Sequence, residues 1–473
     1  MKKLLVLASA LSLVITFGVH PNASLAAETG AEVCKLTDGQ PEFLRGLPRG
    51  TVVNGQTARA AVGFPFDSGR FPVRGSANLI AVMVTFKDTK KFVDSPRKFL
   101  GPQTKKIRDW SKFWSQGKFT YEFQIIENWI ELPINSSEAP SDDKLLAAMI
   151  LERFPKDVDF SNVDGTFIYW APGIDGGKKH DFGLRVGSNE QSFLPNEQRP
   201  GLIWAPSQYH YENSGGRNGL KYKTKRKYTW AYWVHELLHE QGLNLHAPGN
   251  GWATGVGQNQ YPNPGMGGAF SAAMTGWESF LIGWLNDSQV FCVDATAPGT
   301  NFQVNLTPLE IYGGKKKVAV VKLSDTKALV VESRRPTGYT EKWKTSSKGV
   351  FVYLIDVATG EIDDHSPNDC GNDPAFTKWA YYLFPDGKKY PNSYCGSFDP
   401  ALVKKGQSVT YRNLKISVTN TQARFDRIQI AKTSRKPVSR SELLIAHLPG
   451  ITRKATLYSA CSCCGCSPTP DFN

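Results

Sequence analysis

Three histidines and a glutamate lie close together near the middle of the chain. The segment Trp233–His246 is WVHELLHEQGLNLH, in which His235 and His239 are four residues apart and Glu236 follows the first of them. Residues four apart share one face of an α-helix, so both imidazoles can bind a single Zn²⁺. Zinc lowers the pKa of a bound water toward neutrality, and Glu236 can take its proton as the water attacks a carbonyl. The pattern predicts metal-assisted hydrolysis.

The third protein ligand has two candidates. Gly242 can turn the chain out of the helix through a left-handed conformation, which would bring His246 back toward the metal. The alternative is Glu278, which lies farther along the chain in the helix-like stretch AMTGWESF and offers a carboxylate to the zinc. We favour His246 and keep Glu278 as the alternative third ligand.

The metal-binding helix needs elements that hold it in place. Trp230, Val234, Leu237 and Leu238 give it apolar bulk. Before it, the hydrophobic pattern predicts a helix over residues 104–116, which ends at Gly117. It also predicts strands over residues 78–86, 119–132, 166–170 and 201–205. Strands and helices are interleaved up to about residue 290, which predicts an α/β or α+β domain.

After Cys292 the pattern changes to short strand-like runs separated by Gly, Pro, Asp and Lys. These runs are 302–309, 317–323, 328–332, 349–355 and 414–418, and they predict a smaller all-β domain. The expected organisation is a segment 27–76 that is a pro-segment or N-terminal wrap, a catalytic domain 77–290, a β-rich domain 291–432 and a basic tail 433–473 that ends in a CSCCGC cluster.

The N-terminus has the features of an export signal. Lys2 and Lys3 precede the apolar run Leu4–Val19, and small residues around Ala26 predict cleavage there, so that residues 1–26 are a signal peptide. No later apolar run is long enough to cross a bilayer. We expect a secreted protein without integral membrane association.

Export also predicts an oxidising compartment, in which the eight cysteines can form disulfides. Cys370 and Cys395 bracket a loop rich in Gly, Asn, Pro and Asp and are the preferred pair. Cys34 lies in the segment 27–76, where a thiolate could block the zinc in a latent form.

Three further stretches resemble the immune inhibitor A-like secreted metalloproteases. They are WSQGKFT at 114–120 with WIELP at 129–133, PGMGG at 264–268 with WESFLIGWL at 277–285, and VVESRRP at 330–336 with GVFVYLID at 349–356. The resemblance covers roughly residues 77–360. It implies an α+β, zincin-like catalytic domain with a mixed sheet and an active-site helix, followed by the β-domain.

The same resemblance implies Zn²⁺ as the cofactor and Met266 as the methionine under the metal site. The chain departs from the metzincin pattern at the third ligand. That pattern would place it at Leu245, one residue before His246, and related enzymes often have an acidic residue there. A one-residue bulge after Gly242 could absorb the difference.

The formal net charge of +13 and the basic run Lys221–Lys227 leave a second function open. The run can be a solvated loop beside the cleft, or it can bind an anionic surface or wall polymer. The alternative function is therefore a non-catalytic exported binding protein on a zincin scaffold. Glu236 favours the enzyme, a zinc endopeptidase, because a degenerate protease commonly loses that carboxylate. A zinc hydrolase acting on a non-peptide amide or ester is a third possibility.

We expect a protein or peptide substrate and no nucleic acid. The acidic stretch Asp363–Asp369, which contains His365, could hold Ca²⁺ through oxygen ligands, although it lacks EF-hand spacing.

Overall fold

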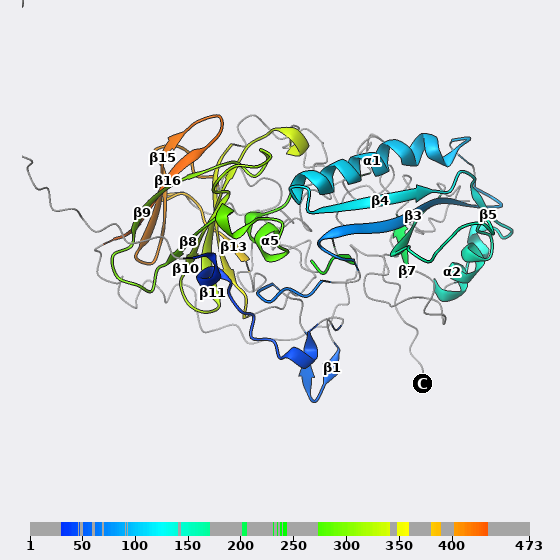
Figure 1. Ribbon diagram of the computed structural model, residues 1–473, viewed down its shortest axis with the longest axis horizontal. Coiled ribbons are helices and arrows are strands. Elements are labelled where there is room, and N and C mark those ends of the chain that lie inside the picture. The colour runs from blue at the N-terminus through cyan, green and yellow to red at the C-terminus, as the bar shows by residue number, and fades with distance from the viewer. Residues whose placement is uncertain are drawn as a thin grey trace, which may run out of the picture.

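The protein has an α+β architecture with several β-sheets and few helices (Figure 1). The computed structural model describes residues 30–45, 47, 51–58, 62–68, 71–89, 91, 93–140, 143–170, 201–205, 230, 234, 237–238, 240–243, 273–340, 348–358, 380–388 and 402–433. Within these residues no helix combines the length and the apolarity that crossing a bilayer requires.

The first sheet is built around β3 (Gly75–Phe86), the strand predicted from the apolar run at 78–86. Its order is β4-β3-β6-β7, and β5 pairs with β3 beyond the end of β4. The other strands are β4 (Phe119–Ile125), β5 (Ile130–Leu132), β6 (Gly165–Trp170) and β7 (Gly201–Ala205). Every pairing between these described strands is parallel, so they differ from the mixed sheet that was expected.

Helices cover both faces of this sheet (Figure 1). Side chains of β3 alternate between two cores, with Leu79 and Ala81 on the side of α1 (Pro96–Trp114) and Ile80 and Val82 on the side of α2 (Asp143–Leu151). Helix α1 begins eight residues before the predicted start at residue 104 and contains Pro102 in its interior. A proline there removes one helical hydrogen bond, which is why the sequence pattern suggested a later start.

Two further sheets pack face to face as a β-sandwich. The five-stranded sheet has the order β13-β12-β11-β10-β8 and the four-stranded sheet the order β14-β15-β16-β9. Their strands are β8 (Val290–Asp294), β9 (Asn301–Leu306), β10 (Val318–Lys322), β11 (Lys327–Arg334), β12 (Gly349–Asp356), β13 (Ala380–Tyr382), β14 (Ser408–Tyr411), β15 (Leu414–Thr421) and β16 (Asp426–Lys432). Val321 and Val331 from one sheet meet Ile416 and Ile428 from the other in a shared core. The five runs predicted as strands all lie on strands of this sandwich.

The opposite face of the five-stranded sheet packs against the rest of the protein. Val320 and Val330 belong to the same hydrophobic core as Trp110 of α1 and Trp277 of α5 (Gly276–Leu281). Because both faces are covered, all eight residues of β12 are buried, which explains its continuous apolar run. One hydrophobic core therefore contains residues from both sides of position 290. The limits expected for the catalytic domain and the β-rich domain stay predictions.

The N-terminal segment runs along the junction between these parts. It contains two short 3₁₀ turns and a small hairpin, which are η1 (Ala31–Cys34), η2 (Glu42–Leu44), β1 (Val52–Val53) and β2 (Gln56–Thr57). The other 3₁₀ turns in the described part of the chain are η3 (Ser136–Glu138), η6 (Asp287–Gln289) and η7 (Gly338–Thr340). Cys34 forms a disulfide with Cys292 of β8, with the two Cα atoms 5.9 Å apart. The proposed latency through a Cys34 thiolate is therefore wrong, because a disulfide sulfur is no longer a thiolate ligand.

Candidate metal centre

The predicted metal ligands His235, His239 and His246, together with Glu236 and Met266, lie outside the described residues. Some residues of the surrounding stretch are described, and they are helical at Trp230, Val234, Leu237, Leu238 and Glu240. The prediction that this stretch is helical is confirmed at those positions. Val234, Leu237 and Leu238 are each 0% exposed and belong to the main core, as the predicted apolar bulk requires.

This helix ends at Gly242, as the sequence predicts. Gly242 has a positive φ of 99°, and the backbone N–H of Leu243 donates to the carbonyl of Leu238 at 3.1 Å. This six-to-one bond around a positive-φ glycine is the Schellman motif, in which Leu238 and Leu243 also share a hydrophobic core. The turn directs the chain out of the helix at Gly242.

Two side chains from other parts of the chain bond to the backbone of this helix, one at its start and one near its end. At its start, Gln103 Oε1 of α1 accepts from the backbone N–H of Trp230 at 3.0 Å. At its end, the Tyr121 hydroxyl of β4 donates to the carbonyl of Leu237 at 3.2 Å. Burial, and then the Glu240 carboxylate, raise the pKa of Tyr121 well above its usual value, so the hydroxyl remains a donor. No sequence motif marks Gln103 or Tyr121, so these positioning contacts were not predicted from the sequence.

The alternative ligand Glu278 is buried in the first turn of α5. Thr275 is the N-cap residue: its hydroxyl oxygen accepts from the Glu278 N–H at 3.1 Å, and the hydroxyl donates to Glu278 Oε2 at 2.9 Å. Glu278 is only 3% exposed, so it is not a solvated helix residue. The histidines with which it would share a metal lie outside the described residues.

Buried charges on β11 hold the start of α5. Glu332 Oε2 accepts from the Gly276 N–H at 2.6 Å and from the Tyr353 hydroxyl at 3.1 Å. Arg334 Nη1 donates to Glu332 Oε1 at 2.7 Å and to the carbonyl of Met274 at 2.9 Å. Burial raises the pKa of Glu332, which the neighbouring Arg334 opposes. Met274 itself is 0% exposed and packs in the main core.

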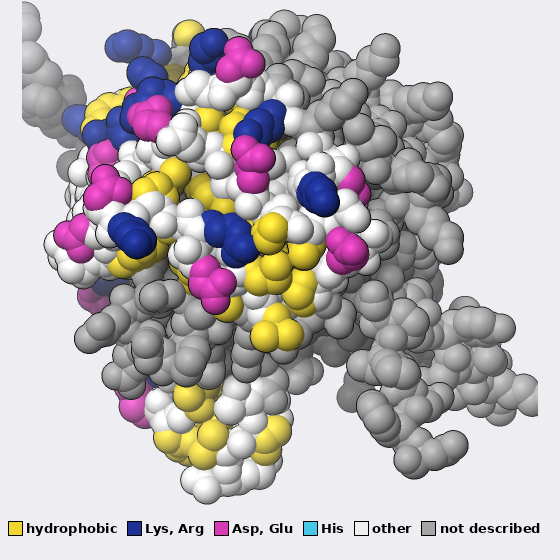
Figure 2. All heavy atoms as spheres, turned by 90° about the vertical axis from the view of Figure 1, so that its right-hand side faces the viewer, with side chains coloured by type: hydrophobic (Ala, Val, Ile, Leu, Met, Phe, Trp, Pro, Cys, Tyr) yellow, Lys and Arg dark blue, Asp and Glu magenta, His cyan; other side chains and the backbone are white. Residues whose placement is uncertain are grey.

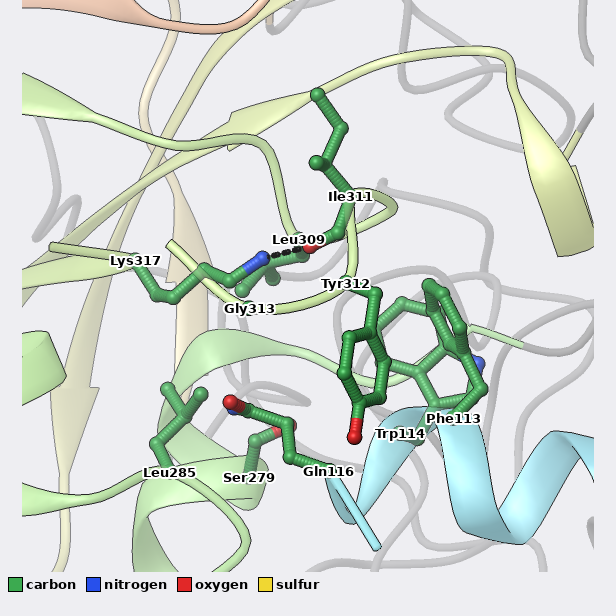
Figure 3. Close-up of a pocket in the computed structure, with 10 residues that line it drawn as sticks. All are labelled: Phe113, Trp114, Gln116, Ser279, Leu285, Leu309, Ile311, Tyr312, Gly313 and Lys317. Atoms are coloured by element: carbon green, nitrogen blue, oxygen red, sulfur yellow. Dashed lines mark hydrogen bonds between the residues drawn. The ribbon is translucent and has the colours of Figure 1, made fainter. Parts of the chain in front are cut away.

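A small hollow lies between the end of α1, α5 and the loop after β9 (Figure 3). Its lining is mostly apolar and aromatic, with Lys317, Ser279 and Gln116 as polar members. Its volume of about 10 Å³ suits roughly one water molecule. Burial lowers the pKa of Lys317 to about 8, and its ammonium donates to the carbonyls of Pro308 and Ile311. The hollow is too small for a peptide substrate.

Several other predicted features lie outside the described residues. They are the signal peptide 1–26, the basic run 221–227, the acidic stretch 363–369, Cys370, Cys395 and the tail from 434 onward. On the described part of the face in Figure 2, basic and acidic side chains are intermixed. Arg97–Glu127 and Lys91–Glu131 are ion pairs between exposed side chains.

No protein-family model matches the chain, and no curated protein matches it. Among solved structures, the chain is similar to a catalytically inactive OgpA from Akkermansia muciniphila in complex with an O-glycopeptide (glycodrosocin) substrate. The likeness has a TM-score of 0.24 and 13% sequence identity, and it covers 61% of this chain and 85% of that chain. A similarity of this size supports no inference about the present chain.

Proposed function

We propose that this chain is a secreted, zinc-dependent endopeptidase. His235, His239 and His246 would hold the zinc, and Glu236 would act as the general base. The observation that supports this function is the helix around the HELLH sequence, which is helical at every described position from 230 to 240 and closes in a Schellman turn at Gly242.

The phase of this helix suits the proposed ligands. Val234 and Leu238 are fully buried and mark the face that packs on the core. Successive residues of an α-helix are about 100° apart, so positions 235 and 239 share a face turned away from that core by about that angle. Imidazoles at these positions of a regular helix would be one turn apart and could converge on one ion. Three imidazoles with an open fourth position are a donor set typical of catalytic zinc.

Each group then has a defined role in peptide hydrolysis. Zinc would supply an acidified water and polarise the scissile carbonyl. Glu236 would accept the proton of that water and deliver it to the departing amine, because a carboxylate beside the first ligand reaches the water rather than the metal. Gln103, Tyr121 and the turn at Gly242 would hold the helix that carries these groups.

Removal of the metal tests this proposal. We expect the purified secreted protein to hydrolyse casein, to lose this activity on dialysis against a zinc chelator and to regain it with one equivalent of Zn²⁺. Adding Ca²⁺ alone should leave the chelated enzyme inactive, and adding it with zinc tests whether the stretch 363–369 contributes stability. Hydrolysis that survives complete zinc removal would exclude the mechanism.

The third ligand is tested by two substitutions. His246→Ala is expected to lose zinc on dialysis, whereas Glu278→Gln should keep it, because Gln preserves the volume and can still accept the Thr275 hydrogen bond. Bound metal is measured by atomic absorption, and folding by circular dichroism. The reverse result, zinc kept in His246→Ala and lost in Glu278→Gln, would make Glu278 the ligand.

The second candidate, a non-catalytic exported binding protein, rests on the basic run at 221–227. It predicts binding to an anionic polymer with a steep salt dependence and no hydrolysis by the zinc-loaded protein. The intermixed charges on the described surface of Figure 2 give this candidate no additional support.

A further inference from the structure

The N-terminal residues 31–73, here called the strap, contribute to the main core of the protein. Cys34, Leu36, Val62 and Phe71 are each at most 3% exposed and share that core with α1, α5 and the five-stranded sheet. A removable pro-segment would leave a large part of this core open to water on departure. The burial therefore favours the N-terminal wrap over the pro-segment.

A disulfide links the start of the strap to the rest of the protein, and polar contacts join its two halves. The disulfide Cys34–Cys292 ties it to β8. The backbone N–H of Phe64 donates to the carbonyl of Leu36 at 2.7 Å. Arg45 forms a buried ion pair with Asp38 at 2.8 Å and donates to the carbonyl of Pro65 at 3.0 Å. The two halves of the strap are thus joined to each other.

The second half of the strap, residues 62–73, contacts α5 and the residues just after it. The indole N–H of Trp277 donates to the carbonyl of Val62, and that of Trp284 donates to the carbonyl of Val73, both at 2.9 Å. The ring of Phe64 lies 5.8 Å from Trp277 and 5.0 Å from Phe280 between centroids.

The same half of the strap contacts the end of the helix at 230–240. The backbone N–H of Phe71 donates to the carbonyl of Glu240 at 2.9 Å. The side-chain amide of Gln241 donates to the carbonyl of Pro72, also at 2.9 Å. The last carbonyls of a helix have no partner within it, so the Phe71 bond satisfies one of these groups from outside. The strap therefore caps the helix end next to position 239.

Gln241 is the residue whose side chain bonds the helix end to the strap. It is 0% exposed and its Nε2 bonds to the strap, while its Oε1 has no hydrogen-bond partner among the described residues. Burying an unpaired amide oxygen is unfavourable. Among the described residues, the bond from Nε2 to the Pro72 carbonyl is the polar contact that this amide makes.

We propose that residues 31–73 stay in the mature protein as a permanent strap, and that Gln241 is a positioning residue through which the strap holds the zinc-binding helix. The proposal rests on the proposed zinc site for its functional consequence. Outer partners of metal ligands commonly change metal affinity by about 10–100-fold when they are removed. The strap bonds to the helix end two residues after His239, so we expect its loss to change zinc affinity by a factor in the same range.

The test compares Gln241→Leu with Gln289→Leu in the full secreted chain. Gln289 is also a buried glutamine, and its amide bonds to Gln116 and Gly314 rather than to the strap. Zinc release is followed with a chromogenic chelator at a temperature well below unfolding. We expect Gln241→Leu to release zinc about tenfold faster than the wild type and to lose kcat with little change in KM, with Gln289→Leu close to the wild type.

Amide hydrogen exchange of residues 237–243 in the zinc-free protein provides a readout that needs neither metal nor activity. It should be about tenfold faster in Gln241→Leu and unchanged in Gln289→Leu. If amide exchange in Gln241→Leu is as slow as in the wild type, the positioning role is overturned, even if the protein proves to be a peptidase. Faster exchange in a protein without zinc or hydrolysis would uphold the strap contact and refute the proposed function instead.

The mature N-terminus tests retention directly. Mass measurement of the active secreted protein, before and after reduction, should give one chain that begins before Cys34 in both cases. An active protein that begins after residue 73 would overturn the proposal. Recovery of a separate N-terminal peptide on reduction would indicate a nicked strap that only the Cys34–Cys292 bond retains.

Discussion

Replacing Glu236 by Gln is expected to lower kcat/KM for peptide hydrolysis by about 10²–10⁴-fold while zinc stays bound. The amide has nearly the same size as the carboxylate but cannot accept the proton of the metal-bound water. Since Glu236 is proposed as the base and not as a ligand, the metal content should remain at one equivalent. Hydrolysis of a fluorogenic peptide and atomic absorption measure the two quantities.

The matched control is Glu240→Gln, the same substitution one helical turn later. Glu240 is buried, and its main-chain carbonyl, which the strap uses, is unchanged by the substitution. Its carboxylate has no part in the proposed reaction, so activity should remain within a few-fold of the wild type. Equal losses in both variants would point to a general effect of helix charge. Loss of zinc from Glu236→Gln alone would make that carboxylate a ligand.

The sequence predicts those elements whose burial is nearly uniform. β3 and β12 are continuous apolar runs because both faces of their sheets are covered, and their limits agree with prediction to within a few residues. The start of α1 was missed because Pro102 is a local signal against helix that packing of Leu100 and Ile107 overrides. β16 was missed because its alternation of Ile428 and Ile430 with polar residues is short.

The HExxH motif and His246 could be found from the sequence because these residues lie close together along the chain. The groups that hold the helix at 230–240 could not, since Tyr121 and Leu237 are 116 positions apart and neither is unusual by itself. The disulfide shows the same limit. Cys34 and Cys292 are 258 positions apart, and spacing alone favoured a different pair. Contacts of this kind depend on tertiary packing rather than on local pattern.

The buried charges on β11 lead to the second large effect. Arg334 lies between the carboxylates of Glu332 and Glu310, with its Nε 2.8 Å from Glu310 Oε1, and all three side chains are at most 2% exposed. Arg334→Met keeps the apolar stem but leaves two buried carboxylates without this cation. Breaking a buried pair in this way typically costs about 3–5 kcal/mol of the free energy of unfolding. Urea denaturation at pH 8 measures it.

The deficit of Arg334→Met should shrink as the pH falls toward 5. Burial raises the folded pKa of Glu332, and losing Arg334 raises it further. A carboxyl with a raised folded pKa binds more protons in the folded than in the unfolded state, so the folded state gains stability as the pH falls through that folded pKa. Arg335→Met is the matched control, because Arg335 follows directly after β11 and pairs with Asp426 at the start of β16. Both variants should lose stability, but only Arg334→Met, which also removes the donor to the Met274 carbonyl, should speed amide exchange in α5. A loss below about 1 kcal/mol at pH 8 would contradict the assigned role, because it would equal that of an exposed ion pair.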